Sequence, residues 1–390
     1  MNKLIDRVSS LFQPAKLLSP GVYHYQTPPE AASQYRLHLR VADDGAGLLI
    51  INASTILHLN QTAAEFVHHL IQGSTTEDAA RAISSRYHIS RDEARLDFLD
   101  IKRKIHTILE TPDLDPISFL DISRQDPYSG ALTAPYRLDC ALTYSLPEKS
   151  NLDLAPVKRV ERELDTDEWI MIIDRAWELG IPHLIFTGGE PTIRKDLIDL
   201  INRAEQNGQV TGLLSDGYKL KDPEFLTALL ESGLDHLLFA LTPQDKESWI
   251  ALQAVLKEDL FTTVHITINP QVLPILPQTI EQCAVYGANG ISLSTSNPED
   301  PKLADALTLA RSLVAEAGLP LKWDLPVPYS AHNPVSLELE NEPEVVEGAG
   351  RAWFYVEPDG DVLPGQGINK VIGNMLNPDW RELWVKERED

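Results

Sequence analysis

LIFTGGEPTIRKDL, residues 184–197, is an apolar strand pattern that runs directly into Gly188, Gly189, Glu190 and Pro191 before a helical pattern begins. In a parallel α/β sheet, ligands bind at the carboxyl ends of the strands, where glycines let the backbone approach a small molecule. An ordinary tight turn is the alternative, because glycine pairs are common in turns. Glu190 is correspondingly either a ligand-binding carboxylate or a capping residue for nearby backbone donors.

The sequence around this stretch alternates between strand and helix patterns from Tyr136 onward. Six apolar runs are separated by amphipathic stretches: YRLDCALTY, HLIFT, VTGLLS, HLLFAL, TTVHITI and GISLST. This alternation predicts a parallel sheet with crossover helices, and we expect an α/β fold with a partial (β/α)6 TIM-like barrel over residues 136–329. Residues 330–390 predict a short irregular extension with one hairpin, whose turn is Asp359-Gly360.

A different pattern precedes the repeats. YRLHLRV and GLLIINAS predict two strands around the turn ADDGAG, and three helical patterns follow, one of them opening with Ser90 and Glu93 in capping-box spacing. This order predicts a small α+β winged-helix-like domain over residues 21–112, after an N-terminal segment at 1–20. Residues 113–135 are rich in Pro, Asp and Ser, which is typical of a linker.

Composition narrows the classes of partner and location. The 390 residues include 34 Lys and Arg against 58 Asp and Glu, for a net charge of −24. Such an excess repels phosphate backbones and anionic headgroups, so we expect no nucleic acid and no membrane partner, and favour a basic peptide or protein. Without a membrane-spanning run or a signal sequence, the chain is predicted to be cytoplasmic. Cys140 and Cys283 are predicted to be buried free thiols.

Taken together, these motifs resemble the radical S-adenosylmethionine (radical SAM) superfamily. Gly188, Gly189, Glu190 and Pro191 match its GGEP-type motif, and LLSDGYKL resembles its TNG-type strand end, with Ser215 near the start. The resemblance implies an S-adenosylmethionine pocket at these residues. VEPDGDVLPGQG is similar to a SPASM or twitch extension over residues 330–390, and GLLIINASTILHLNQTAAEFVHHLIQG resembles a PqqD-like peptide recognition domain.

The resemblance also implies a CxxxCxxC motif after the first barrel strand, whose thiolates hold a [4Fe–4S] cluster. Leu146, Ser150 and Asp153 occupy the three aligned positions, and none of them is a cysteine. From this substitution we predict a degenerate family member without an iron–sulfur cofactor, a metal site or catalytic residues, in which the S-adenosylmethionine pocket is vestigial.

The predicted function is therefore binding of a peptide or protein partner in a peptide-modification pathway, such as the biosynthesis of ribosomally made and modified peptides. An intact radical enzyme paralogue is a second expected partner. PqqD-like domains, as the resemblance implies, take up a leader peptide as an added strand, which predicts peptide binding at Leu48, Leu49, Ile50 and Ile51.

Two enzymatic alternatives remain open. One is an enzyme that binds S-adenosylmethionine for non-radical chemistry. The other is an unrelated α/β hydrolytic or acid/base enzyme that pairs Glu190 with His183 or His236. Each histidine lies beside an apolar strand, where a buried structural histidine is the more common situation.

Overall fold

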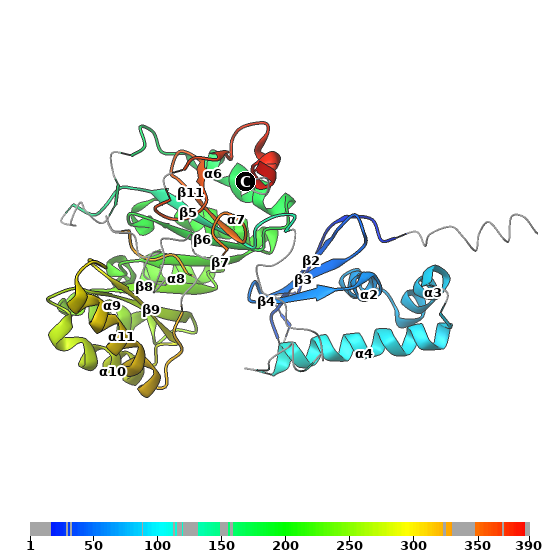
Figure 1. Cartoon of the computed structure of the whole chain (residues 1–390), viewed down its shortest axis with the longest axis horizontal. Helices are drawn as coiled ribbons and strands as arrows, with labels where there is room; N and C mark the ends of the chain where they lie inside the picture. The colour runs from blue at the N-terminus through cyan, green and yellow to red at the C-terminus, as the bar shows by residue number, and fades with distance from the viewer. Residues whose placement is uncertain are drawn as a thin grey trace, which may run out of the picture. The chain divides into compact units, whose positions relative to one another are not determined.

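The computed structural model divides the chain into two compact units, Met1–Ser129 and Gly130–Asp390 (Figure 1). The residues that it describes are 17–28, 30–31, 33–87, 89–111, 114, 119, 132–148, 155–156, 159–322, 325–329, 348–368 and 370–386. Within them, no helix combines the length and the apolar character needed to cross a bilayer.

Among its described residues, the first unit has a four-stranded antiparallel sheet and three helices. Its strands follow the order β1-β2-β3-β4 and are β1 (Gly21–Gln26), β2 (Arg36–Val41), β3 (Gly47–Ile51) and β4 (Thr55–Leu59). The helices are α2 (Gln61–Ile71), α3 (Thr76–Tyr87) and α4 (Arg91–Glu110). Alternate strand residues such as Leu37, Leu39 and Leu57 form a core with Val67 of α2 and Ile105 of α4. The predicted capping box of Ser90 and Glu93 opens α4.

The predicted free edge at residues 48–51 is wrong. Leu48, Leu49, Ile50 and Ile51 belong to β3, which pairs with β2 on one side and with β4 on the other. The two edges of the sheet are instead β1 and β4, neither of which is apparent as a separate run in the sequence. The backbone of Leu48–Ile51 is therefore not available to pair with an added peptide strand.

The second unit is built on a nine-stranded sheet with the order β10-β9-β8-β7-β6-β5-β11-β12-β13. Its strands are β5 (Arg137–Thr143), β6 (His183–Gly188), β7 (Val210–Ser215), β8 (His236–Leu241), β9 (Phe261–Ile268), β10 (Gly290–Thr295), β11 (Trp353–Val356), β12 (Asp361–Leu363) and β13 (Gly373–Asn374). Strands β5 to β10 are parallel neighbours in chain order, so the predicted α/β fold with a partial barrel is confirmed.

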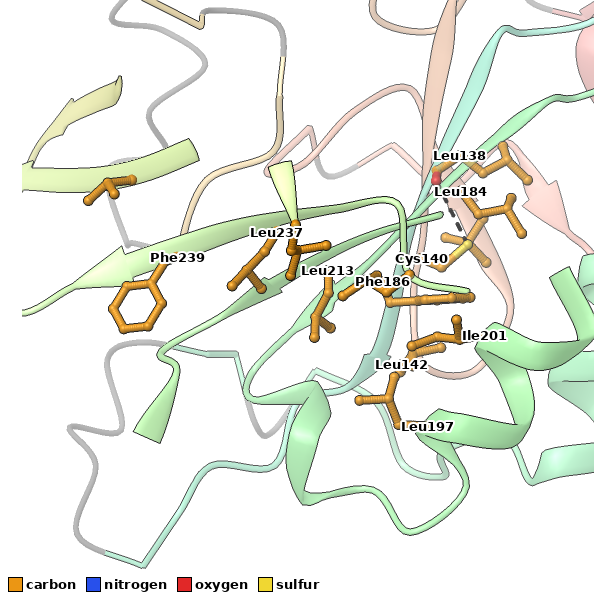
Figure 2. Close-up of a cluster of buried hydrophobic side chains, with 14 of the residues drawn as sticks. Leu138, Cys140, Leu142, Leu184, Phe186, Leu197, Ile201, Leu213, Leu237 and Phe239 are labelled. Atoms are coloured by element: carbon orange, nitrogen blue, oxygen red, sulfur yellow. Dashed lines mark hydrogen bonds between the residues drawn. The ribbon is translucent and has the colours of Figure 1, made fainter. Parts of the chain in front are cut away.

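Helices follow the parallel strands as crossovers. They are α6 (Thr166–Glu178), α7 (Leu197–Asn207), α8 (Pro223–Glu231), α9 (Lys246–Val255), α10 (Leu276–Tyr286) and α11 (Pro301–Glu316), with α12 (Leu383–Lys386) near the end of the chain. Their apolar faces and the outer face of the sheet share one large core. Figure 2 shows part of it, where Cys140 and Leu142 of β5 lie among Phe186 of β6 and Leu197 and Ile201 of α7.

The C-terminal extension is more regular than the sequence predicts. β11 pairs in parallel with β5, so residues 353–356 continue the main sheet beyond the first barrel strand. β12 then returns antiparallel to β11 through the predicted Asp359-Gly360 turn, in which Gly360 has a φ of +87°. Extension and barrel therefore share one sheet and one core, to which Trp380 and Trp384 also contribute.

Candidate functional site at the carboxyl ends of the strands

The two glycines of the GGEP stretch lie against the backbone that follows β5. Gly189 N–H donates to Thr143 O (2.7 Å) and Glu190 N–H donates to Ser145 O (3.1 Å). A Cβ on Gly188 would stand 2.1 Å from Thr143 O, and one on Gly189 would stand 2.3 Å from Ser145 O. Gly188 also has a φ of +121°, which favours glycine. In this chain both glycines serve the close packing of two strand ends.

Glu190 joins the ends of β6 and β7. Its Oε1 accepts hydrogen bonds from Thr192 N (3.0 Å), Thr192 Oγ1 (2.6 Å) and Ser215 Oγ (2.8 Å), and its Oε2 accepts one from Asp216 N (2.8 Å). The side chain is 2% exposed and caps the short 3-10 helix Pro191–Ile193. The structure thus brings the predicted pocket residues Gly188, Glu190, Pro191 and Ser215 together, with Glu190 in a capping role.

Burial controls the protonation of this carboxyl group. Burial is the largest cause, and the nearby charge of Asp216 the second, of a rise in the pKa of Glu190 to about 7. Hydrogen bonds from Thr192 and Asp216 oppose this rise. Burial also raises the pKa of Asp216. Near neutral pH the pair therefore carries fewer than two negative charges, because two adjacent carboxylates do not ionise independently.

This shift predicts a pH-dependent stability that Glu190→Gln should remove. The folded pKa of Glu190 lies above its usual value, so its contribution to the free energy of unfolding is complete below about pH 4.5 and is lost as the pH rises through about 7, by up to about 3 kcal/mol. Burial lowers the pKa of His236 to about 4 and that of His265 to about 3. These two shifts make the free energy of unfolding rise with pH, and they act in both the wild type and Glu190→Gln.

Urea titrations from pH 4.5 to 8, followed by tryptophan fluorescence, measure the difference. All seven tryptophans follow residue 130, so the signal reports on the second unit. The stability difference between wild type and Glu190→Gln should shrink with rising pH. A difference that is constant across this range would contradict the shifted pKa.

Two basic side chains that no sequence motif indicated hold the loop after β6. Arg194 donates to the carbonyls of Leu142 (2.9 Å) and Leu164 (3.1 Å), and it forms a two-point ion pair with Asp196 (2.9 and 2.7 Å). Lys219, from the loop after β7, donates to Thr192 O (2.6 Å). Arg194 is the seventh residue of the GGEPTIR stretch. Its closeness to the glycines is the feature of the sequence that could have indicated its role in holding this loop.

The segment that follows β5 is fixed by residues distant in sequence. Glu163 accepts hydrogen bonds from Thr143 Oγ1 (2.9 Å) and Tyr144 N (2.8 Å). Tyr144 Oη donates to Glu357 Oε1 (2.9 Å), and Glu357 also pairs with Arg159. No local sequence pattern could have indicated the Tyr144–Glu357 contact, because 213 positions separate the two residues.

Leu146, at the first of the three aligned cluster positions, is half-buried and packs beside Tyr144, Ala155 and Tyr355. Ser150 and Asp153 lie outside the described residues. Over the part of the chain that the structure describes, no three His, Cys, Asp or Glu side chains are grouped so as to hold a metal ion.

The two cysteines are free and fully buried in the core shared by sheet and helices. Cys140 points from β5 into this core, with its Sγ near Leu138 O, as the dashed line in Figure 2 marks. Burial raises the pKa of both thiols, which disfavours the thiolate form that iron binds. Two separated and buried thiols do not fit a site that needs three thiolates.

The histidines of the acid/base alternative do not approach Glu190. His183 and His236 are the first residues of β6 and β8, and their Nε2 atoms lie 2.7 Å apart. Glu190 follows the opposite end of β6, about 16 Å farther along at the usual rise of a strand. Burial lowers the pKa of both imidazoles. This pair therefore forms a neutral contact at the amino ends of the strands, and it does not support the acid/base alternative.

Comparisons with known proteins agree with this architecture. Residues 140–257 match the model of the radical SAM superfamily and form a domain of that superfamily. PqqA peptide cyclase of Granulibacter bethesdensis is 26% identical over 61% of this chain and 70% of its own length. The Ruegeria pomeroyi protein of that name is 31% identical over 58% of this chain and 66% of its own length.

A solved structure covers more of the chain. Streptococcus suis SuiB bound to S-adenosylmethionine matches with a TM-score of 0.60 at 16% identity, over 89% of this chain and 86% of that one. SuiB bound to its precursor peptide SuiA matches with a TM-score of 0.57 at 14% identity, over 89% and 88%. At such low identity the likeness establishes the fold.

These relationships contradict the prediction that no iron–sulfur cofactor is expected. The superfamily matched by residues 140–257 binds iron–sulfur clusters together with S-adenosylmethionine, so the comparisons point to a cluster-bearing family. The error lay in inferring the cofactor from three aligned positions alone. Cys140 and Cys283 remain the only cysteines in the chain.

Proposed function

We propose that this chain, which carries a radical SAM superfamily domain at residues 140–257, binds a peptide in a peptide-modification pathway. Its N-terminal unit would serve as a PqqD-like peptide recognition domain, and residues 330–390 as a SPASM- or twitch-like extension. The names of the similar proteins, which are PqqA peptide cyclases and SuiB bound to precursor peptide SuiA, support the pathway. The observation that carries the proposal is the edge of the small sheet at β4, which no other described strand covers.

β4 has the features of a peptide-docking edge. Among the described residues, it pairs with β3 alone, so one side of its backbone is available for a further strand. Exposed edges are usually protected by charged side chains, yet Thr55–Leu59 contains no Lys, Arg, Asp or Glu. Ile56 lies opposite Ile50 of β3, and both side chains point away from the core that contains Leu57. Ile50 is fully buried, whereas Ile56 is half-buried. A docked peptide would therefore extend the apolar strip of these two residues and contact it at Ile56.

Charge favours a basic peptide. Most of the acidic excess of the chain lies after residue 130. Long-range attraction would speed the association of a peptide rich in Lys or Arg, and added salt would reduce that gain.

We further propose that the chain acts as a binding partner of the modifying enzyme, with an intact paralogue performing the chemistry. The burial of both thiols away from the carboxyl edge supports this role. Mixing the chain with such a paralogue and its peptide would test it, because a binding partner should raise the rate of modification without modifying the peptide alone.

Substitution at the two sheet edges tests the peptide site. Ile56→Asp on β4 should weaken peptide binding at least about tenfold, because it places a charge in the apolar strip beside the docked strand. Val22→Asp on β1 is the matched control, since Val22 is also half-buried on an edge strand of the same sheet. The ligand would be a peptide selected from a random display library on the full-length chain, and fluorescence anisotropy would measure its affinity.

Hydrogen exchange locates the bound peptide independently. The amides of residues 55–59 should exchange more slowly in the complex, while those of residues 21–26 should not change. Equal losses of affinity in Ile56→Asp and Val22→Asp, or protection confined to the second unit, would remove β4 from the proposal.

A second candidate function is the binding of S-adenosylmethionine at Gly188, Gly189, Glu190, Pro191 and Ser215. The joining of two strand ends by the Glu190 carboxylate, at the edge where α/β sheets bind ligands, favours it. The same ligand would serve the alternative of non-radical chemistry. Calorimetry with S-adenosylmethionine and S-adenosylhomocysteine tests the pocket, and undetectable heat at millimolar ligand would exclude it.

A further inference from the structure

We propose that Glu357, in the C-terminal hairpin, is a positioning residue for the Gly188–Glu190 loop, and that it acts through Tyr144. The inference rests on the proposed S-adenosylmethionine pocket only for its effect on ligand affinity. Its structural content is a series of contacts along the carboxyl ends of β11, β5, β6 and β7. The members of this series, called the edge belt here, are Arg159, Glu357, Tyr144, Ser145, Glu190 and Asp216.

The belt begins at a buried carboxylate. Glu357 directly follows β11 and is 3% exposed, and its N–H donates to Asp361 O (2.8 Å) across the hairpin turn. Arg159 pairs with both of its oxygens, through Nε to Oε1 and through Nη2 to Oε2 (3.0 Å). An unpaired carboxylate at this depth would be costly, and the ion pair with Arg159 offsets that cost while Oε1 also accepts from Tyr144 Oη.

Tyr144 passes this restraint to the backbone after β5. Its side chain is anchored at the hydroxyl by Glu357, and its N–H is anchored by Glu163. The next residue, Ser145, presents its carbonyl to Glu190 N–H at 3.1 Å. A shift of Tyr144 would therefore change the position of the acceptor that holds Glu190.

Glu190 carries the restraint to the next strand. Its carboxylate accepts from Ser215 Oγ and Asp216 N, which end β7. The belt therefore reaches from the C-terminal hairpin to Glu190 and Ser215 of the proposed pocket. The extension thus takes part in shaping the pocket, although its own strands lie on the other side of β5.

Packing alone is the competing explanation. Tyr144 also lies in a small core with Ala141, Tyr355 and Leu363, which could hold the segment without any hydrogen bond. Tyr144→Phe separates the two explanations, because it keeps the ring and removes the hydroxyl that Glu357 accepts from. Glu357→Gln keeps the size of the side chain and removes the charge that pairs with Arg159.

The experiment measures amide exchange in the ligand-free, full-length protein. Exchange at Gly189 and Glu190 should be at least about tenfold faster in Tyr144→Phe and in Glu357→Gln, since losing a hydrogen bond to a charged group changes an equilibrium by about that factor or more. The double variant should match the single variants, because both changes interrupt the same path. Arg381→Ala is the matched control, since Arg381 ties the same extension to Glu178 of α6 at the surface.

Calorimetry then relates the belt to the pocket. The dissociation constant for S-adenosylmethionine should rise about tenfold in both belt variants and stay unchanged in Arg381→Ala. If the wild-type protein releases no heat with millimolar ligand, the pocket proposal fails, while the exchange data still test the positioning role. Unchanged exchange at Gly189 and Glu190 in Tyr144→Phe, or equal acceleration in Arg381→Ala, would overturn the inference.

Discussion

Gly188→Ala should destabilise the second unit by about 3 to 5 kcal/mol, which is enough to prevent folding in many domains. The new Cβ would stand 2.1 Å from the carbonyl oxygen of Thr143 and 3.4 Å from the Cα of Ala141, both of them backbone atoms that cannot rotate away. The φ of +121° adds conformational strain to this overlap. Urea unfolding followed by tryptophan fluorescence, or the soluble yield if the variant aggregates, measures the loss.

Gly287→Ala separates the overlap from the backbone strain. Gly287 ends α10 with a φ of +88°, and a Cβ there would meet no atom within 4 Å. Its alanine variant should therefore lose only the conformational part, about 1 to 2 kcal/mol. Similar losses at the two positions would mean that the contact between Gly188 and Thr143 contributes little, and the tight pairing of these strand ends would have to be abandoned as the reason for the glycine.

Arg194→Met should cost about 2 to 4 kcal/mol of unfolding free energy. The guanidinium is 13% exposed and serves the carbonyls of Leu142 and Leu164 as well as the carboxylate of Asp196. Methionine fills a similar volume but removes the donor to both carbonyls and the ion-pair partner of Asp196, which keeps its hydrogen bond from Thr166. The same urea titration measures it.

Arg203→Met provides the comparison. Arg203 makes an equally short two-point ion pair with Asp174 (2.7 and 2.8 Å), but the two side chains are 38% and 33% exposed. Water replaces the lost partner there, so the variant should lose less than about 1 kcal/mol. A loss in Arg194→Met no larger than in Arg203→Met would show that the carbonyl contacts of Arg194 do not hold the loop.

The six barrel strands could be predicted because each is a single apolar run bounded by polar or glycine residues. The runs VTGLLS, HLLFAL and GISLST coincide with β7, β8 and β10. The edge strands of the small sheet lacked such a signal. β1, GVYHYQ, mixes aromatic and polar residues. β4 follows a turn in which Asn52 and Ala53 have positive φ values. Alanine rarely adopts this conformation, so the sequence does not indicate the turn.

The candidate site divides in the same way. The sequence placed Glu190 and Ser215 at neighbouring strand ends because the parallel alternation brings carboxyl ends together. It did not indicate that the carboxylate oxygens of Glu190 would accept hydrogen bonds from Thr192, Ser215 and Asp216. Hydrogen bonds between loops depend on the conformations of those loops. Contacts that cross the whole chain, such as Tyr144 with Glu357, leave no periodic trace in the sequence.

The parallel pairing of β11 with β5 has a consequence for the order in which the chain folds during synthesis. β5 leaves the ribosome more than 200 residues before β11, and until then one edge of the first barrel strand has no partner. A nascent or truncated chain that ends before Trp353 would therefore expose the backbone of a strand that is otherwise fully buried, a template for aggregation. The barrel unit is thus complete only when its last hairpin has been synthesised.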